Sequence, residues 1–593
     1  GPTWKTDSGV SYGNSRIHYQ DIDLGAFNGV TIQRNNVQIL FDDIFYLRPG
    51  KITVLDPQGR PVDWTDLSSY ALVTANSNRQ RTYDTVKQAY TNLRRDFLVR
   101  DTVLSLKVGI DARQKVRDLR GPGGNLEEYT FVGQDRVANS TRTPTNQLGV
   151  PHDDNVARFL DEAFSQRIPD FGMPQQQFVD NKKVWQNYLS NPQEWTRNAA
   201  TEYSDVVLFS RRAQETISAA FFRLDTSFLR NRLKITTGLR AEQTNIEAEG
   251  PRTDPTLAYL RDANGDVVRN AAGQLQFIVP PTPLTLQYNQ LTILERGYKA
   301  KKEYLRLFPS INANYNFSES LVGRLAYYQT VGRPDFNQYS GGLTLPNTEL
   351  ANPNDLIRVS NVSIKAWQAE TYMGRLEYYF ANNVGQLTFA YFIRDYENMF
   401  ANVTSPVTPE FLEAYGLDEE TYSIYQVVTQ FNAPNPIRMK GIEVGYRQAL
   451  TFLPNWARGT SFFANFSSQR AKNSFDYFTA MSPFTVNWGL SLSRQKFNLR
   501  INENYRGIQR RAQIATARGV ESGTYNYAPK RLYIDVSGEY YISRSLGVFI
   551  SIRNIGSATE DTKIYGPNTP SYAHFRQRDD YSSLWTFGVK GTF

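Results

Sequence analysis

The chain has no cysteine and only three histidines among its 593 residues. The absence of cysteine excludes disulfide bonds, thiolate metal sites and cysteine nucleophiles. The three histidines, His18, His152 and His574, lie too far apart in the sequence for the spacing that metal ligands show. We therefore predict neither a metal site nor a bound cofactor.

Long apolar runs are also missing. No stretch approaches the roughly 18 consecutive apolar residues that a membrane-spanning helix needs. A chain of this kind can cross a membrane only as a closed barrel, because the open edge of a sheet cannot be satisfied in lipid. The first residues, Gly1-Pro2-Thr3, lack the basic and apolar regions of a secretion signal. That start predicts a processed or truncated form if the protein is exported.

The excess of positive charge is small. The chain has 66 basic and 58 acidic residues, a net charge of +8. Over this length, such an excess gives no more than a hint of an anionic ligand or surface. No basic run is dense enough to indicate nucleic acid, and we interpret Lys299-Ala300-Lys301-Lys302 as a solvated turn. We therefore predict no nucleic-acid partner.

Aromatic residues, by contrast, are abundant. There are 36 Tyr, 35 Phe and 8 Trp, although the mean hydropathy is only −0.51. A transmembrane barrel combines these properties, since it has an apolar outer band, aromatic girdles and a polar lumen. Composition alone favours the alternative of a large soluble all-β protein. The order of the residues has to decide between the two.

That order shows alternation with a period of two. In a strand, successive side chains point to opposite faces. Near the end of the chain, Trp585, Phe587 and Val589 alternate with polar or small residues, and the same pattern fills 484–493, 497–505, 532–540 and 546–553. Runs of about nine to eleven residues suit a tilted membrane-crossing strand, whereas a soluble strand usually has about five or six. We predict an all-β fold, a transmembrane antiparallel β-barrel, with a β-sandwich or propeller as the alternative.

The phase of the alternation separates inside from outside. Arg500, Asp535, Glu539 and Lys590 all fall on the polar faces of their runs. In a watery lumen such charges cost little, but an Arg or Lys at mid-depth on the lipid face costs about 2–4 kcal/mol. We therefore expect these four side chains to line the lumen.

The connections between the runs are of two lengths. Some are short polar turns, such as 381–383 and 542–545, and others are long insertions, broadly 119–210, 245–300, 335–365 and 400–436. Barrels of this kind have short periplasmic turns and long extracellular loops. We assign 1–593 to one barrel domain, with first strands in 1–118, a long loop insertion at 119–210, and the remaining strands and loops in 211–593. We also expect short loop helices at 153–167 and 409–415.

At this point the chain resembles the TonB-dependent receptors of bacterial outer membranes. Phe308-Pro309-Ser310-Ile311-Asn312 resembles that family's turn before a strand, and Gly332-Arg333-Pro334-Asp335-Phe336 resembles the motif that follows it. No single motif is specific, but their order and spacing agree with the alternation. The other stretches that carry the resemblance are 219–225, 232–244, 324–328, Glu370, 376–379, 439–443, 553–554 and Phe593.

The resemblance implies a barrel of about 22 strands with a plugged lumen. It also implies TonB-dependent active import of a scarce, bulky small-molecule ligand, such as a siderophore, a cofactor or an oligosaccharide, across the bacterial outer membrane. The partners would be outer-membrane lipid, the energy-transducing TonB complex and the barrel assembly machinery, with Phe593 resembling the assembly signal. We find no N-terminal plug domain or coupling box in this chain, through which TonB would act.

Two other functions stay open. A barrel that has no plug would be a passive, porin-like channel, and a barrel can also support a surface enzyme or adhesin. Adjacent acidic pairs such as Asp42-Asp43 and Glu127-Glu128 point apart on a strand or loop, so we predict no catalytic residues and no enzyme. Trp185, Tyr188 and Trp195 are weak candidates for stacking on a ligand, although packing of the loop is the favoured role for these aromatics.

Overall fold

The fold was analysed in a computed structural model of the 593-residue chain. The residues that the structure describes are 4–19, 21–45, 48–99, 102–121, 127–136, 153–169, 172–281, 284–350, 352, 354–360, 365–433, 435–472, 481–514 and 520–591.

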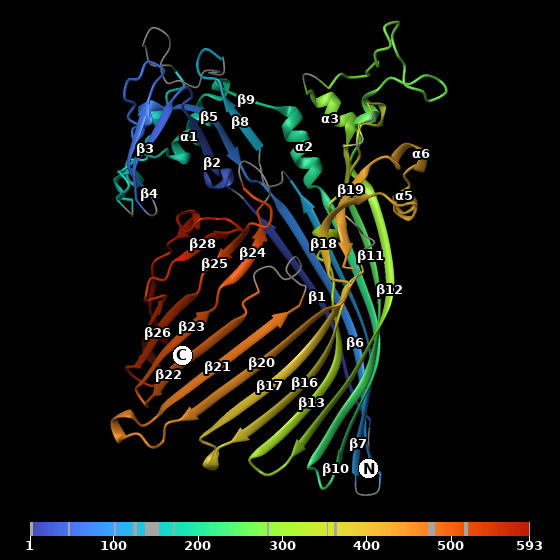
Figure 1. The fold of residues 1–593 in the computed structure, drawn as a ribbon, viewed down its shortest axis with the longest axis vertical. Coiled ribbons are helices and arrows are strands. Elements are labelled where there is room, and N and C mark those ends of the chain that lie inside the picture. Colours follow the sequence, from blue (N-terminus) through green and yellow to red (C-terminus); the bar gives the residue numbers. More distant parts are fainter. Residues whose placement is uncertain are drawn as a thin grey trace.

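The dominant element is a curled antiparallel wall, in which each strand is hydrogen-bonded to the next (Figure 1). Sixteen strands of the described residues form this run, where the family resemblance implies about 22 in a whole barrel. The two end strands, β1 and β30, are exposed along almost their whole length. In order, the wall strands are β1 (Lys5–His18), β6 (Arg81–Val99), β7 (Thr102–Arg120), β10 (Arg211–Phe228), β11 (Leu233–Thr253), β12 (Ile293–Asn316), β13 (Leu321–Gly332), β16 (Trp367–Tyr379), β17 (Gly385–Glu397), β20 (Ile437–Ala449), β21 (Thr460–Ala471), β22 (Phe484–Ser493), β23 (Phe497–Arg506), β26 (Arg531–Tyr541), β27 (Leu546–Arg553) and β30 (Leu584–Gly591).

The register confirms the predicted phase of the alternation. Opposite residues of an antiparallel pair share a face, and Val548 pairs with Val589 while Ile550 pairs with Phe587. Phe587 is 67% exposed and Val589 is 68% exposed, as lipid-facing residues should be. The four charges predicted in the lumen lie on the opposite face, where Lys590 forms an ion pair with Glu539.

Strands β6, β7, β10, β11 and β12 are much longer than a membrane crossing requires (Figure 1). On β12 the outward residues are apolar or aromatic from Leu305 to Tyr315 and become charged above Leu305, at Lys301 and Glu303. We therefore take 305–315 as the membrane-crossing part of β12. The run Lys299-Ala300-Lys301-Lys302 lies within this strand, so its interpretation as a turn was wrong.

A subdomain stands above the wall on the side with the long loops. It contains a four-stranded sheet of β2 (Gly29–Gln33), β5 (Ala71–Ser77), β8 (Glu127–Phe131) and β9 (Trp195–Arg197), a hairpin of β3 (Gln38–Phe45) and β4 (Arg48–Leu55), and the helix α1 (Asn181–Ser190). Its buried core includes Phe27, Leu72, Phe131 and Val156. Two separate parts of the sequence thus build one unit, 21–77 from within 1–118 and 127–197 from within the insertion at 119–210.

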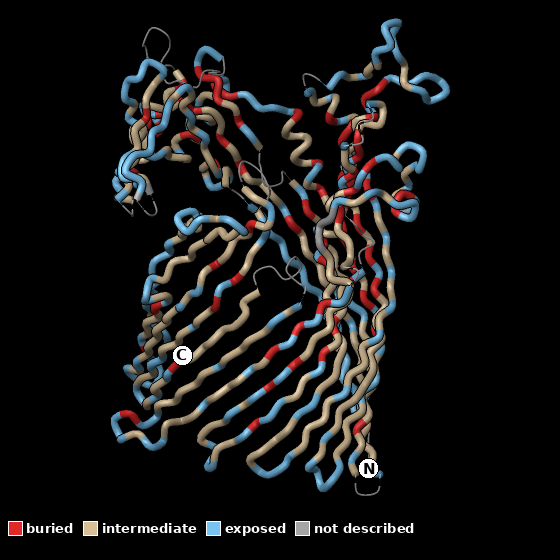
Figure 2. The backbone as a smooth tube through the Cα atoms, in the orientation of Figure 1, coloured by how far each residue is buried: buried red, intermediate tan, exposed pale blue. Residues whose placement is uncertain are grey.

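The other long insertions are folded against the mouth of the wall. They comprise α2 (Ala199–Phe209), α3 (Leu286–Thr292), α4 (Phe336–Ser340), β14 (Leu343–Thr344), β15 (Leu356–Val359), β18 (Phe400–Pro406), α5 (Pro409–Tyr415), α6 (Glu419–Tyr422) and β19 (Gln426–Asn432). A further small sheet contains β24 (Gln509–Gln513), β25 (Tyr525–Ala528), β28 (Glu560–Tyr565) and β29 (Phe575–Asp579). Figure 2 shows that buried stretches gather in these upper parts, whereas the lower wall is mostly intermediate or exposed.

The two predicted loop helices have different outcomes. The helix at 409–415 is confirmed as α5, which Thr408 caps by accepting a hydrogen bond from the Phe411 amide. The stretch 153–167 holds only two short 3₁₀ turns. The first turn stops at Leu160, which is extended and bridges to Val179, so contact with a distant segment overrides the local helical pattern. Nowhere in the described residues is a helix both long and apolar enough to cross a membrane.

The two faces of β22 give a direct test of the lipid assignment. Leu490 points outward and is 44% exposed, while its neighbour Ser491 points into the lumen. We expect Leu490→Arg to lower the free energy of unfolding in lipid vesicles by about 2–4 kcal/mol, since it places a charge in hydrocarbon. Ser491→Arg is the matched control and should change it little. Urea titration of the vesicle-inserted protein measures both, and equal effects of the two variants would contradict the assignment.

Candidate functional site

A row of cations lines the lumen face of β7 near the mouth. Arg113, Lys115 and Arg117 alternate with Gln114 and Val116, so all three point to the same side of the strand. The pairing continues from β7 through β10 and β11 to β12, which brings its own inward residues, Lys302, Tyr304 and Arg306, onto that face.

Acidic side chains neutralise only part of this charge. Asp84 accepts two hydrogen bonds from Arg117, at 2.8 Å and 2.7 Å. Asp111 and Glu242 are both bound by Arg240, each with its shortest contact at 2.6 Å. In contrast, Arg113, Lys115 and Arg306 form no ion pair with a carboxylate of the described chain.

The cations without a carboxylate have other surroundings. The Lys115 Nζ atom lies 5.1 Å from the centroid of the Phe336 ring. The Arg306 guanidinium lies 5.9 Å from the Tyr304 ring, and its buried Nε atom has no hydrogen-bond partner among the described residues. A positive side chain held this way keeps most of its capacity to bind an anion.

The motif at 332–336 shapes this part of the wall. Arg333 forms ion pairs with Glu242 at 2.5 Å and with Glu215 at 3.8 Å, so it joins this motif to the stretch 232–244. Asp335 then caps α4 through a capping box with Gln338, and Phe336 and Tyr339 are buried against the inner face of β10 and β11. These contacts fix a loop helix on the lumen side, beside Lys115 and Arg117.

Lys302 is a titratable group near the mouth whose pKa is displaced from its ordinary value. It lies above the membrane-crossing part of β12, half-buried beside Ile246. Burial, together with the neighbouring charges of Lys365 and Arg306, lowers the pKa of Lys302 to about 8. Burial is the larger of these causes, and the like charges of Lys365 and Arg306 add to it.

The predicted ligand-stacking aromatics lie together in the subdomain. Trp185 and Tyr188 are stacked with ring centroids 5.3 Å apart, and Trp185 meets Phe27 edge-on at 5.0 Å. Trp195 is 6% exposed, and its indole N–H donates to Asn187 at 3.0 Å. This arrangement is that of loop packing, the role favoured for these residues.

Two of the other residues named from the sequence, His152 and Phe593, fall outside the described residues. Among those described, no group of three or more His, Asp or Glu side chains is arranged to hold a metal ion. The lumen cations at 113, 115 and 117 were missed as a site. Their signal was present in the sequence, because cations at alternate positions of a strand must share one face.

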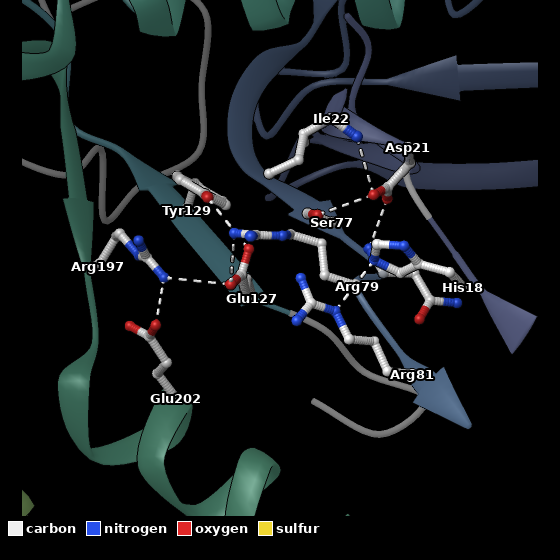
Figure 3. A network of polar contacts seen from close by, with 11 residues as sticks. His18, Asp21, Ile22, Ser77, Arg79, Arg81, Glu127, Tyr129, Arg197 and Glu202 are labelled. Carbon is white, nitrogen blue, oxygen red and sulfur yellow. Dashed lines mark hydrogen bonds and ion pairs between the residues drawn. The ribbon is translucent and has the colours of Figure 1, made fainter. Parts of the chain in front are cut away.

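A polar network joins the subdomain to the wall (Figure 3). Glu127 on β8 forms two ion pairs. One is with Arg79, which precedes β6, at 3.5 Å, and the other is with Arg197 of β9 at 3.8 Å. At the end of β1, Asp21 accepts hydrogen bonds from Ser77 and from the Ile22 amide, both at 2.9 Å. Arg79 thus ties the segment between β5 and β6 to β8 of the subdomain.

The comparisons with known proteins agree with this fold. The family model described as TonB dependent receptor-like, beta-barrel, matches residues 3–555. The chain therefore belongs to the TonB-dependent receptor β-barrel family, whose members are outer-membrane receptors of Gram-negative bacteria. No curated protein matches the sequence.

Solved structures that resemble the chain are distant in sequence. The ferric-catecholate import receptor Fiu from K12 E. coli, in its closed form, has 12% identity and a TM-score of 0.48, over 99% of this chain and 64% of that one. P. aeruginosa FpvA, bound to a heterologous pyoverdine, has 10% identity and a TM-score of 0.48, over 99% and 54%. The siderophore receptor PiuA from Acinetobacter baumannii has 10% and 0.47, over 99% and 72%. The chain thus spans less than two thirds of the length of Fiu and of FpvA.

The role of Arg333 can be tested against a matched ion pair. Its side chain is only 17% exposed, and removing one partner of a buried pair leaves the other charge uncompensated. We expect Arg333→Ala to lower the free energy of unfolding by about 3–5 kcal/mol. In Arg438→Ala, which removes a 61% exposed arginine from Asp395, the loss should be about 0–1 kcal/mol. Denaturant titration of both variants measures the difference, and similar losses would show that Arg333 does not anchor the motif.

Proposed function

We propose that this chain forms the wall and the extracellular part of a TonB-dependent importer that takes up a bulky anionic solute across the outer membrane. The observation that carries the proposal is the excess of cations on the lumen face at the mouth, from Arg113, Lys115 and Arg306. An iron-loaded siderophore with catecholate or carboxylate groups has the matching charge. Family membership supports import as the activity, since an outer membrane holds no nucleotide triphosphate to drive uptake.

In this proposal the cations act as an electrostatic funnel. A lumen lined by one sign of charge focuses the field and raises the local concentration of an oppositely charged solute. Arg113 is exposed to the lumen, whereas Lys115 and Arg306 are half-buried near aromatic rings. As the family resemblance implies, the TonB complex would supply the energy by acting on a plug domain, and the barrel assembly machinery would insert the wall.

The proposal predicts charge-selective uptake. Two probes of similar size are compared in cells that make the full-length protein, an iron-loaded tris-catecholate, which is anionic, and an iron-loaded tris-hydroxamate, which is neutral. We expect Lys115→Gln with Arg306→Gln to weaken binding of the tris-catecholate about tenfold or more, because charged hydrogen bonds contribute about 1.5–3 kcal/mol each. Binding of the neutral probe should be weak in every variant.

The matched control is Lys301→Gln. Lys301 adjoins Lys302 on β12 but points to the outer face, where its side chain is 81% exposed, and its loss should leave binding unchanged. Uptake is measured with and without a protonophore that collapses the energy source of TonB. Uptake that ignores the protonophore favours the passive channel, and equal preference for the two probes contradicts the anionic solute.

The pKa of Lys302 predicts a pH dependence of binding. Since this pKa is about 8, the side chain is mostly charged at pH 7 and mostly neutral at pH 9. Affinity for the tris-catecholate, whose own charge is constant over this range, should therefore fall as the pH rises. Lys302→Arg keeps its charge throughout and should abolish the fall. Affinity measured from pH 7 to 9 decides the point, and an identical decline in both proteins would exclude Lys302 as the cause.

A further inference from the structure

The turn between β20 and β21 stands out at the lower end of the wall, opposite the long loops. It spans 450–459, whereas the lower turns on either side of it span only 380–384 and 494–496. Gly385 pairs with Gln448, so the turn at 380–384 closes at that level and the turn at 450–459 continues below it. Barrels of this kind have short turns at the periplasmic end. The turn at 450–459 is therefore an unusually long projection into the periplasm.

The backbone of this turn has a fixed conformation. The 3₁₀ helix η10 (Asn455–Ala457) forms its centre. Gly459 has a φ of +92°, and a Cβ atom there would collide with the Ser493 carbonyl oxygen, so the turn lies directly against β22. The Arg494 guanidinium of the next lower turn donates to the Asn455 carbonyl. Because the turn is preorganised in this way, a partner can bind it without the cost of ordering a loop.

Two large apolar side chains point from this turn into solvent. Phe452 is 73% exposed and Trp456 is 80% exposed. Membrane barrels place exposed aromatic residues in girdles at the two interfaces, where lipid covers them. The depth of Phe452 and Trp456 relative to the girdle therefore decides whether lipid or another partner covers these two rings.

The lower girdle of the wall lies above the turn. It contains a chain of aromatic rings with successive centroid distances of 5.8, 5.9 and 5.9 Å, those of Tyr378, Phe380, Tyr446 and Phe462. Ala449 ends β20 three residues beyond Tyr446, which is roughly 8 Å along the membrane normal for a strand that rises about 3.3 Å per residue at a tilt of about 40°. The headgroup layer is only about 5–8 Å thick. Phe452 and Trp456 follow Ala449, so they lie in the periplasm and not in lipid.

Cations surround these two rings. Three adjacent lower turns, 450–459, 494–496 and 542–545, hold four cations and no acidic residue, and we call these turns the basic rim; the cations are Arg458, Arg494, Lys496 and Arg544. Backbone hydrogen bonds join the turns, from the Ser493 amide to Gly459 at 3.2 Å and from the Tyr541 amide to Lys496 at 2.7 Å. None of the four cations forms an ion pair with a carboxylate of the described chain. The basic rim is therefore complementary to a partner with several negative charges.

We propose that the basic rim binds an anionic glycan whose sugars carry carboxylate groups, which in the periplasm is the peptidoglycan of the cell wall. The rings of Phe452 and Trp456 pack against the apolar faces of the sugars. Arg458 and Arg494 bind carboxylates through paired hydrogen bonds, and Lys496 adds a further charge. This contact fastens the barrel to the cell wall and is independent of the solute that the lumen takes up.

The size of the surface favours a glycan over an acidic protein. A buried aromatic side chain contributes about 150–250 Å², so Phe452 and Trp456 together offer roughly 300–500 Å². A stable protein–protein interface needs about 800 Å² on each partner. A continuous polymer needs less at each contact, because many copies of the barrel bind one network and the weak contacts reinforce one another.

The test uses the full-length protein in lipid nanodiscs, with purified intact peptidoglycan sacculi as the probe. Co-sedimentation measures the affinity. We expect Phe452→Ser with Trp456→Ser to weaken binding about tenfold, and Arg458→Gln with Lys496→Gln to weaken it about tenfold as well, since each pair removes contacts of about 1 kcal/mol or more. Arg458→Lys with Lys496→Arg keeps both charges and should retain most of the binding.

The matched control is Leu229→Ser with Arg230→Gln. It removes an exposed apolar residue and an exposed cation from the short lower turn at 229–232, and it should leave binding unchanged. Brominated lipid in the nanodisc gives a second readout, because it quenches only tryptophans in contact with the membrane. The fluorescence that is lost in Trp456→Phe should be insensitive to it.

Three results would overturn the proposal. In the first, sacculi bind both weakened variants as tightly as the wild type. In the second, soluble polyglutamate displaces the protein from sacculi as well as solubilised glycan strands do, which would make the partner an acidic polypeptide. In the third, brominated lipid quenches the fluorescence of Trp456, which would place this ring in the membrane.

Discussion

Hydrocarbon offers no hydrogen-bond partner to a backbone N–H or C=O group. The backbone groups of every strand that crosses it must therefore form hydrogen bonds with the neighbouring strands. The antiparallel ladder from β1 to β30 is the direct result of this constraint. Once the ladder is set, side chains alternate between two solvents, lipid outside and water inside. The fold, the placement of charge and the proposed solute site depend on that alternation.

The alternation also explains why charged residues can be so frequent in a membrane protein. Arg117, Arg240 and Arg333 lie on the lumen face, where Asp84, Asp111 and Glu242 pair with them. On the outer face below Leu305 the same strands carry Leu, Ile, Phe and small residues. Each strand therefore needs only a period-two pattern to be stable, and the identity of the inward residues is left free for binding.

The wall could be predicted from the sequence because its signal is local. The spacing of Trp585, Phe587 and Val589 alone predicts a lipid-facing strand. The register places these residues on the outer face. The subdomain could not be predicted, because it depends on contacts between residues far apart, such as Phe27 with Trp185. The stretch 153–167 shows where prediction from local spacing stops. Its apolar residues have helical spacing, but the bridge between Leu160 and Val179 determines its structure. The prediction of a turn at 299–302 was wrong for a related reason. The charge of this run suggested a turn, but pairing with β11 extends the strand above the membrane.

The long strands at the mouth carry different sets of charges on their two faces. On β12, Lys301 points outward while Lys302 points inward to the lumen. On β7, Arg113, Lys115 and Arg117 are on the lumen face while Asp118 and Arg120 are on the outer face. A shift of the register by one residue would exchange the two sets, so the many ladder bonds of these strands are as important for function as the charges themselves. The extra length of β6, β7 and β10 to β12 carries this two-faced pattern beyond the membrane-crossing part of the wall.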